Sequence, residues 1–123
     1  MKKRIIIAGS RNYNNYEYVK ETLDLVLNDL MNEDIEIICG DARGVDMLGK
    51  RYADEHSIPV IHFPADWDKY GRSAGVIRNA EMAKYAAKTY GILIAFWDGE
   101  SRGTKNMIET ASKYGLYICE YRV

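Results

Sequence analysis

The stretch GILIAFWDGESRGT, residues 91–104, contains the transition that decides the fold. Residues 91–97 are apolar without interruption, which is typical of a strand that is buried on both faces of a sheet. The loop that follows, residues 98–101, is polar and contains a glycine, and the chain then turns helical. A buried strand that passes through a short loop into a helix is the building unit of an α/β protein.

The same transition recurs along the chain. Short apolar runs rich in β-branched residues predict further strands, so that the full set is 4–9, 35–40, 58–63, 91–97 and 116–123. Between them, apolar residues at helical spacing predict helices, with apolar faces at Val19, Leu23, Val26, Leu27 and Leu30; at Val45, Leu48, Tyr52 and Ala53; at Ile77, Ala80, Met82, Ala83 and Ala87; and at Met107, Ile108 and Ala111. This alternation predicts a doubly wound parallel sheet, a Rossmann-like three-layer α/β/α fold, in a single domain over residues 1–123.

Composition excludes several classes of protein. The net charge of −1 argues against a dedicated nucleic-acid-binding protein, which usually carries a basic excess. The sequence has no apolar run long enough to span a bilayer, and its start, MKKRIIIAGS, turns polar too soon for a signal peptide. We therefore expect a cytoplasmic protein without a membrane partner, in which Cys39 and Cys119 are reduced thiols. No Cys/His pair has the spacing of metal ligands, and the sequence predicts neither a metal nor a cofactor.

The polar loops of the predicted fold gather on one edge of the sheet. Loops that leave the carboxyl ends of parallel strands open on the same side, and ligands bind there. These loops are GSRNY, GDARGVD, PADWDKYGRSAG and DGESRGT, whereas the loops of the opposite edge are plainer. The asymmetry predicts a ligand site at the carboxyl edge.

The residue types of these loops suit a phosphorylated ligand with a ribose and a base. Arginines bind phosphate, glycines let backbone amides approach a ligand, hydroxyl groups and helix N-termini donate to anions, and carboxylates accept from ribose hydroxyls. The candidate ligand-binding residues are Gly9, Ser10, Arg11, Gly40, Asp41, Arg43, Gly44, Asp46, Asp66, Trp67, Arg72, Ser73, Gly75, Arg78, Asn79, Asp98, Gly99, Ser101, Arg102, Gly103 and Thr104.

Several of these residues also have a purely structural interpretation. Ser10, Ser101 and Thr104 can cap helices or form turns, and Asp46 can complement a helix dipole. Trp67 can be a wedge under its loop instead of a platform for a base. His62, inside a predicted strand, is expected to be a hydrogen-bonded core histidine.

These motifs resemble the SLOG superfamily, and the YspA-like branch of small, often phage-borne proteins most of all. The resemblance is carried by GSR, GDARGVDMLGKRYA, FPADWDKYGRSAGVIRNAEM and IAFWDGESRGTKNMIETA and spans nearly the whole chain. It implies a Rossmann-like fold, a tendency to form dimers, and binding of nucleotides or nucleotide-derived ligands.

One branch of that superfamily, the LOG phosphoribohydrolases, cleaves an N-glycosidic bond in a nucleoside monophosphate. RNAEM places Arg78 at the arginine of that branch's R-K-x-x-M pattern, and GESRGTKNM places Gly99, Gly103 and Thr104 near its phosphate loop, P-G-G-x-G-T-x-x-E. Met107 stands where those enzymes have a carboxylate, and Glu109 lies two residues further on.

Three functions follow as hypotheses. The first is a homodimeric binding protein that senses or sequesters a nucleotide-derived ligand, which the lack of an obvious nucleophile favours. The second is an N-glycosidase, in which Arg78 holds the phosphate or ribose and Asp46, Asp98 or Glu109 stabilises the transition state or activates water. Binding of single-stranded DNA, the third, is disfavoured by the near-neutral charge.

Overall fold

A computed structural model describes residues 2–30 and 33–123. Its elements follow the order β1 (Lys3–Gly9), α1 (Tyr16–Leu27), β2 (Ile35–Cys39), α2 (Val45–Glu55), β3 (Val60–His62), α3 (Trp67–Tyr70), α4 (Ala74–Ala87), β4 (Tyr90–Trp97), α5 (Arg102–Lys113) and β5 (Tyr117–Arg122). Short 3₁₀ turns over Asn28–Leu30 and Gly71–Ser73 extend α1 and join α3 to α4.

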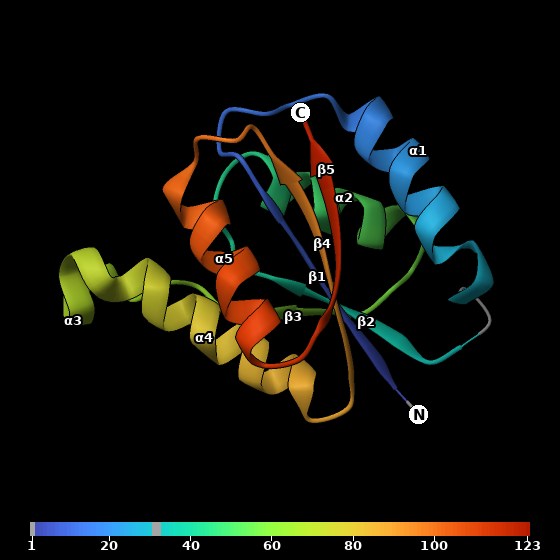
Figure 1. Cartoon of the computed structure of the whole chain (residues 1–123). Coiled ribbons are helices and arrows are strands. Elements are labelled where there is room, and N and C mark those ends of the chain that lie inside the picture. Colours follow the sequence, from blue (N-terminus) through green and yellow to red (C-terminus); the bar gives the residue numbers. More distant parts are fainter. Residues whose placement is uncertain (1, 31–32) are drawn as a thin grey trace.

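The five strands form one parallel sheet in the order β3-β2-β1-β4-β5. The chain winds outward from β1 to β3 and then returns to add β4 on the other side of β1, so the switch point lies between β1 and β4. This confirms the predicted doubly wound, Rossmann-like sheet (Figure 1).

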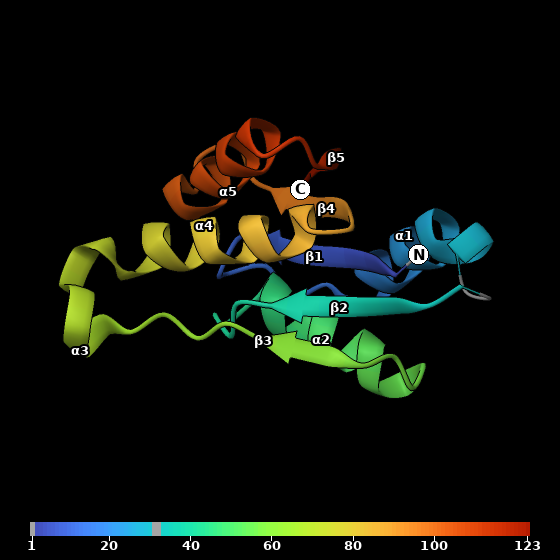
Figure 2. The same cartoon turned by 90° about the horizontal axis from the view of Figure 1, so that it is seen from below.

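Both faces of the sheet are covered by helices, and alternate residues of the strands supply the two cores. On one face, α1 and α2 pack on a cluster that includes Ile5, Ile7 and Phe96. On the other face, α4 and α5 lie side by side and pack on a cluster that includes Ile6 and Leu93 (Figure 2). Residues 5–8 of β1 and 92–96 of β4 are therefore apolar and buried at every position, as expected for strands covered on both faces.

Helix α4 differs from its predicted packing. The apolar spacing placed Ile77 and Ala87 on its inner face, but Ala87 is exposed and the buried positions include Arg78 and Asn79. The first turns of α4 lie beside the carboxyl edge of the sheet, where these two polar side chains face a hollow instead of the core. The helix thus presents an apolar face only along its later turns, through Met82, Ala83 and Ala86.

Within the described part of the chain, no helix is both long enough and apolar enough to cross a bilayer. The two cysteines are free thiols, as predicted, with Cys39 buried and Cys119 half-buried.

Candidate functional site

The four loops at the carboxyl edge of the sheet enclose three adjoining hollows. One hollow, of about 260 Å³, lies between α4, α5 and the end of β1. We call it the main hollow because both Arg78 and Asp46 line it. A second, of about 510 Å³, lies between the loops after β2 and β3, and a third, of about 330 Å³, between the loops after β1 and β4. Arg11 lines all three, which makes them parts of one continuous surface.

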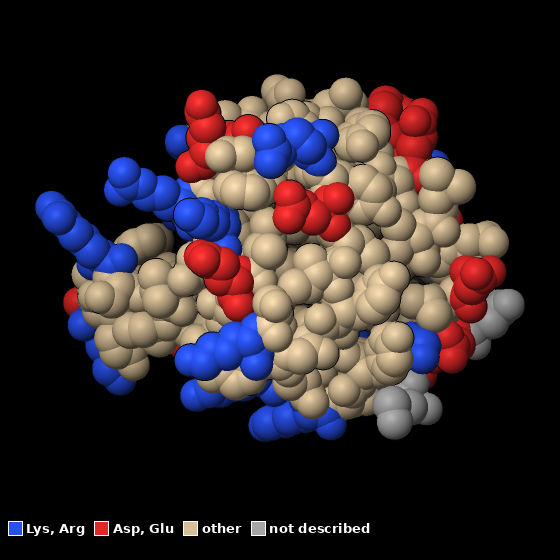
Figure 3. Space-filling view, in the orientation of Figure 1, with Lys and Arg blue, Asp and Glu red and all other residues tan. Residues whose placement is uncertain are grey.

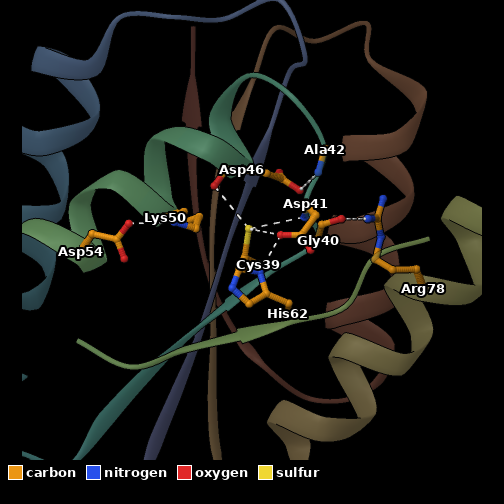
Figure 4. Close-up of polar contacts among 9 residues, drawn as sticks. All are labelled: Cys39, Gly40, Asp41, Ala42, Asp46, Lys50, Asp54, His62 and Arg78. Carbon is orange, nitrogen blue, oxygen red and sulfur yellow. Dashed lines mark hydrogen bonds and ion pairs between the residues drawn. The ribbon is translucent and has the colours of Figure 1, made fainter. Parts of the chain in front are cut away.

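Arg78 is the central charged residue of the main hollow. Arg78 lies on α4, lines this hollow together with Asp46, and is only 8% exposed. Its Nη1 donates to the carbonyl oxygen of Gly40 (Figure 4). Its Nε donates to Oδ1 of Asn79 at 3.0 Å. Among the described residues, its Nη2 has no hydrogen-bond acceptor, so the guanidinium is held on one side and free to bind an anion on the other.

Asn79 and Asn106 hold that arginine in place. Nδ2 of Asn79 donates to Oδ1 of Asn106 at 2.9 Å and to the carbonyl of Gly103 at 3.3 Å, which ties α4 to the first turns of α5. The carbonyl oxygen of the same amide accepts from Arg78. The donor and acceptor groups of the Asn79 side chain therefore both have hydrogen-bond partners, and the residue fixes the position of Arg78 relative to α5.

Asp46 supplies a buried carboxyl group to the same hollow. It lies in the first turn of α2, is 7% exposed, and accepts a hydrogen bond from the backbone N–H of Ala42 at 3.2 Å. Burial raises the pKa of Asp46 to about 6, against the opposing effects of the positive charge of Arg78 and the Ala42 hydrogen bond. Burial likewise lowers the pKa of Arg78, an effect that the nearby Asp46 opposes.

Gly40 is the residue that permits this arrangement. A Cβ atom at this position would lie 2.7 Å from Nη1 of Arg78 and 2.9 Å from Oδ2 of Asp46. Only a glycine leaves room for the two charged groups on either side of the backbone, which explains the glycine directly after β2.

Ser10 joins three of the loops. Its carbonyl accepts from the N–H of Val45 at 3.4 Å, its N–H donates to the carbonyl of Phe96 at 3.1 Å, and its Oγ accepts from the N–H of Asp98 at 3.3 Å. Gly44, at φ +80°, passes so close to the Ser10 carbonyl that a Cβ atom would lie 2.4 Å from it. Ser10 is 4% exposed, and these bonds give it the structural role that the sequence left open beside ligand binding.

The loop after β4 is folded by its own side chains. Oδ1 of Asp98 accepts from the N–H groups of Glu100 and Ser101, both at 2.8 Å, and these bonds lower the pKa of Asp98. Ser101 caps α5, since its Oγ accepts from the N–H of Thr104 at 3.5 Å. The cap interpretation of Ser101 is thus confirmed, and the first turn of α5 faces the main hollow through Gly103 and Thr104.

The loop after β3 carries the aromatic side of the hollow. Helix α3 projects from the body of the molecule, and its first residue, Trp67, is 50% exposed and lines both the main and the second hollow (Figure 1). The guanidinium of Arg11 lies 5.9 Å from the centre of the Trp67 ring. Trp67 is therefore an accessible ring between two of the hollows, while Asp66 caps α3 by accepting from the N–H of Lys69 at 3.1 Å.

Basic side chains gather around the hollows. Arg11, Arg72 and Arg102 are exposed and line the main hollow, and Arg43 lines the other two. Figure 3 shows Lys and Arg side chains projecting beside α3 and the start of α5. Four arginines and one carboxyl group, Asp46, therefore line the main hollow, within a chain whose net charge is −1.

His62 is not the core histidine that the sequence predicts. Its side chain is 42% exposed, and its Nδ1 lies 2.7 Å from Oδ1 of Asp41. The prediction is wrong because β3 is a three-residue strand at the edge of the sheet, where a side chain remains accessible to solvent. Cys39, two residues before Asp41, points into the same cluster, with its Sγ 3.3 Å from Oδ1 of Asp41.

The structure brings most of the predicted ligand residues to the three hollows. Four of them, Gly44, Asp66, Ser73 and Gly99, lie in the same loops but line none of these hollows. Glu109, a candidate acid, is exposed on α5 and lies outside them as well.

Sequence reasoning missed the apolar floor of the main hollow and one of its amides. The floor includes Ala8, Met82 and Met107, and the missed amide is Asn106. The sequence signal for Asn106 is its position four residues beyond Arg102, which places it one helical turn into α5.

Residues 3–70 match the model of the family described as "YspA, cpYpsA-related SLOG family". The chain is also similar to the Gene 61 protein of Mycobacterium phage D29, with 30% identity over 125 residues that cover 97% of this chain and 96% of the phage protein. The matched segment of the family contains the loops after β1, β2 and β3 together with α3.

Proposed function

The chain belongs to the YspA, cpYpsA-related SLOG family, and on that premise we propose that it binds a nucleotide or nucleotide-derived ligand at the carboxyl edge of its sheet. The proposed role is to sense or sequester that ligand. The family supports a nucleotide-related ligand, and the described hollows supply the chemistry that such a ligand needs.

One observation carries this proposal: a buried arginine with a free face on a hollow. Arg78 is bound through Nε and Nη1 to protein acceptors, while its Nη2 has no hydrogen-bond acceptor among the described residues. A charge-assisted hydrogen bond to a phosphate contributes about 1.5–3 kcal/mol. The N-terminus of α5, which faces the same hollow, adds partial positive charge for the same group.

The remaining surface suits the other parts of a nucleotide. Arg72 and Arg102 lie at the rim, within reach of further anionic oxygens. Trp67 offers a half-exposed ring on which a base can stack, and Met82 and Met107 give the hollow an apolar floor. A phosphate near Arg78 and a base toward Trp67 is the arrangement that we propose.

A second function, cleavage of an N-glycosidic bond, is favoured by the position of Asp46. Its carboxyl group is buried in the same hollow as Arg78, and among the described residues its one hydrogen-bond donor is the N–H of Ala42. A carboxyl group beside the ribose can stabilise an oxocarbenium-like transition state or activate water. Asp98, whose Oδ1 is bonded to two backbone N–H groups, is a weaker candidate for this role.

We also propose that the protein acts as one domain over its whole length, as a cytoplasmic homodimer. Exposed apolar side chains support an interface between copies, among them Leu25 at 82% and Tyr117 at 64% exposure. Light scattering on a size-exclusion column measures the mass directly, and a mass near 14.1 kDa would contradict the dimer.

The experiment that tests the proposed function is retention of ligands from a pool. The full chain is incubated with nucleoside monophosphates, dinucleotides, ADP-ribose and cyclic nucleotides, and the bound and free fractions are analysed by mass spectrometry. We expect one compound to be retained intact. Free base plus ribose phosphate would instead show the hydrolase, and no retained or cleaved compound would contradict both functions.

Two variants make the result specific to the hollow. Arg72→Ala removes an exposed arginine at the rim, and Arg51→Ala removes an exposed arginine on α2 that pairs with Glu55 at 3.2 Å. We expect at least about tenfold weaker retention for Arg72→Ala, because a charged hydrogen bond of 1.5–3 kcal/mol is lost, and no change for Arg51→Ala. Equal retention by both variants would place the ligand elsewhere.

A further inference from the structure

Three side chains that can bind a metal meet where β2 and β3 end. Oδ1 of Asp41 lies 3.3 Å from Sγ of Cys39 and 2.7 Å from Nδ1 of His62, and the three ligand atoms all lie within 4.8 Å of one another (Figure 4). From this geometry we propose that Cys39, Asp41 and His62 bind a divalent cation of the zinc class. This proposal goes beyond the proposed nucleotide function and does not depend on it.

The sheet itself brings two of the ligands together. Cys39 and His62 are register partners in the parallel ladder between β2 and β3, so the backbone hydrogen bonds of that ladder keep their Cα atoms in neighbouring positions. Side chains of register partners lie on the same face of a sheet. The Cys and His ligands are therefore placed by the fold and not by a mobile loop.

The third ligand is turned back toward the other two by the backbone. Asp41 has φ +60°, a left-handed conformation that is uncommon for a residue other than glycine. Its N–H donates to Sγ of Cys39 at 3.4 Å, and its carboxylate lies between that sulfur and the His62 ring. A backbone N–H that donates to a cysteine sulfur is the kind of outer contact that orients a metal ligand.

The chemistry of the three ligands selects the cation. Thiolate, imidazole and carboxylate together favour Zn²⁺ over Mg²⁺ or Ca²⁺, which prefer oxygen ligands only. Three protein ligands leave a fourth tetrahedral position for water, and Asp41 and His62 are accessible enough for solvent to reach it, at 29% and 42% side-chain exposure.

Charge around the cluster is compatible with a cation. Among the described residues, neither Lys nor Arg forms an ion pair with Asp41, and the nearby Lys50 pairs with Asp54 at 2.8 Å instead. Thiolate and carboxylate supply two negative charges, which neutralise the charge of Zn²⁺. On binding, the thiol of Cys39 loses its proton to water, His62 donates the lone pair of Nδ1, and no oxidation or reduction takes place.

Sequence spacing cannot find this cluster, because Cys39 and His62 lie 23 residues apart on two different strands. Only Asp41, in the loop after β2, is close to Cys39 in sequence. The expectation of no metal rested on ligands that are close in sequence. The fold supplies the missing proximity.

The experiment is a Co²⁺ titration of the full-length protein after treatment with a chelator. Co²⁺ reports zinc-type sites, and a bound thiolate gives an intense charge-transfer band in the near ultraviolet. We expect the wild type to develop this band, and Zn²⁺ to abolish it by displacement. His62→Gln and Cys39→Ser are expected to weaken Co²⁺ binding by at least about tenfold.

The chain carries its own matched controls, because it has only two cysteines and two histidines. Cys119→Ser and His56→Gln are expected to bind Co²⁺ as the wild type does. His62 is at the surface, so His62→Gln decides the result even if the buried Cys39→Ser variant fails to fold by circular dichroism.

Two outcomes would overturn the proposal: no charge-transfer band in the wild type, or unchanged Co²⁺ affinity in His62→Gln. Either outcome leaves the nucleotide proposal standing, since retention of nucleotides is measured separately and through Arg72.

Discussion

Asn79 on α4 and Asn106 on α5 are joined by a hydrogen bond of 2.9 Å between their side-chain amides. The oxygen of the Asn79 amide accepts from Arg78, so this single bond connects the position of the buried guanidinium to the helix whose N-terminus faces the same hollow. The main hollow is thus shaped jointly by two helices that pack side by side (Figure 2).

Asn106→Ala is expected to weaken ligand binding by releasing Asn79. Loss of one hydrogen bond costs about 1 kcal/mol of stability, and the freed Asn79 amide no longer fixes Arg78. Isothermal titration with the nucleotide retained from the pool measures the change, for which we expect about five- to tenfold weaker affinity. Asn28→Ala, an exposed asparagine in the turn after α1, is the matched control, and the prediction fails if both variants bind alike.

Asp46→Asn separates binding from cleavage. The amide keeps the size of the carboxyl group and can still accept from the N–H of Ala42, so the loop after β2 is expected to stay folded. If the protein is a hydrolase, the variant should retain the nucleotide and lose at least about 100-fold in turnover, because general acid–base groups contribute 10²–10⁴-fold. Unchanged turnover, measured as free base released, would remove Asp46 from the mechanism.

Trp67→Phe tests where the base binds. If a base stacks on Trp67, binding quenches the fluorescence of this half-exposed ring. The chain has only two tryptophans, and Trp97 lies instead beside Arg122, whose guanidinium is 5.1 Å from its ring. We expect the quench in wild type and in Trp97→Phe, and no quench in Trp67→Phe. A quench that survives Trp67→Phe would place the base elsewhere.

Glu36→Gln is expected to lower stability at neutral pH without weakening ligand binding. Glu36 is 4% exposed at the amino edge of the sheet and accepts from Arg4 Nε at 2.8 Å and from the Tyr85 hydroxyl at 2.6 Å. Burial alone would raise its pKa, but these two hydrogen bonds and Lys2 outweigh burial and hold the pKa of Glu36 below its ordinary value. Loss of the charged hydrogen bonds is expected to cost about 2 kcal/mol of unfolding free energy.

The pH dependence of that loss follows from the sign of the shift. A carboxyl group whose pKa is lower in the folded state stabilises the fold above its ordinary pKa, and this contribution disappears as the pH falls through the folded-state pKa. Urea unfolding of wild type and Glu36→Gln should therefore differ at pH 7 and converge toward pH 3. A difference that stays constant with pH would show that the charge of Glu36 contributes nothing.

The sequence predicts the fold well because one pattern, an apolar strand followed by a polar loop, recurs along the chain. The apolar run at 91–97 is a central strand, and the polar loops after the strands meet at one edge as expected. Arg78, Trp67 and the loop glycines were singled out for a related reason, because they lie in the loops that leave the carboxyl ends of the strands or at the helix starts just beyond them.

Errors arise where local context departs from that pattern. The face of α4 was misassigned because Arg78 and Asn79 occupy inward positions that periodicity reserves for apolar residues. His62 was misassigned because a strand at the sheet edge looks, in sequence, like one in its centre. Both errors concern where an element lies relative to the sheet, and a single sequence does not contain that information.

The three loops that meet at Ser10 also set the order of events during synthesis. The hydrogen bond between the N–H of Asp98 and Oγ of Ser10 joins residues that are 88 positions apart in the chain. Asn79, which accepts from Arg78, is in turn held by its hydrogen bond to Asn106 on α5. Contacts between distant parts of a chain form late, because closing a long loop costs conformational entropy before the contacts can contribute favourable free energy. A nascent chain that ends before α5 therefore carries six of the eight arginines, Arg78 among them, but lacks the helix whose first turn lines the main hollow, so that hollow is complete only once α5 has docked.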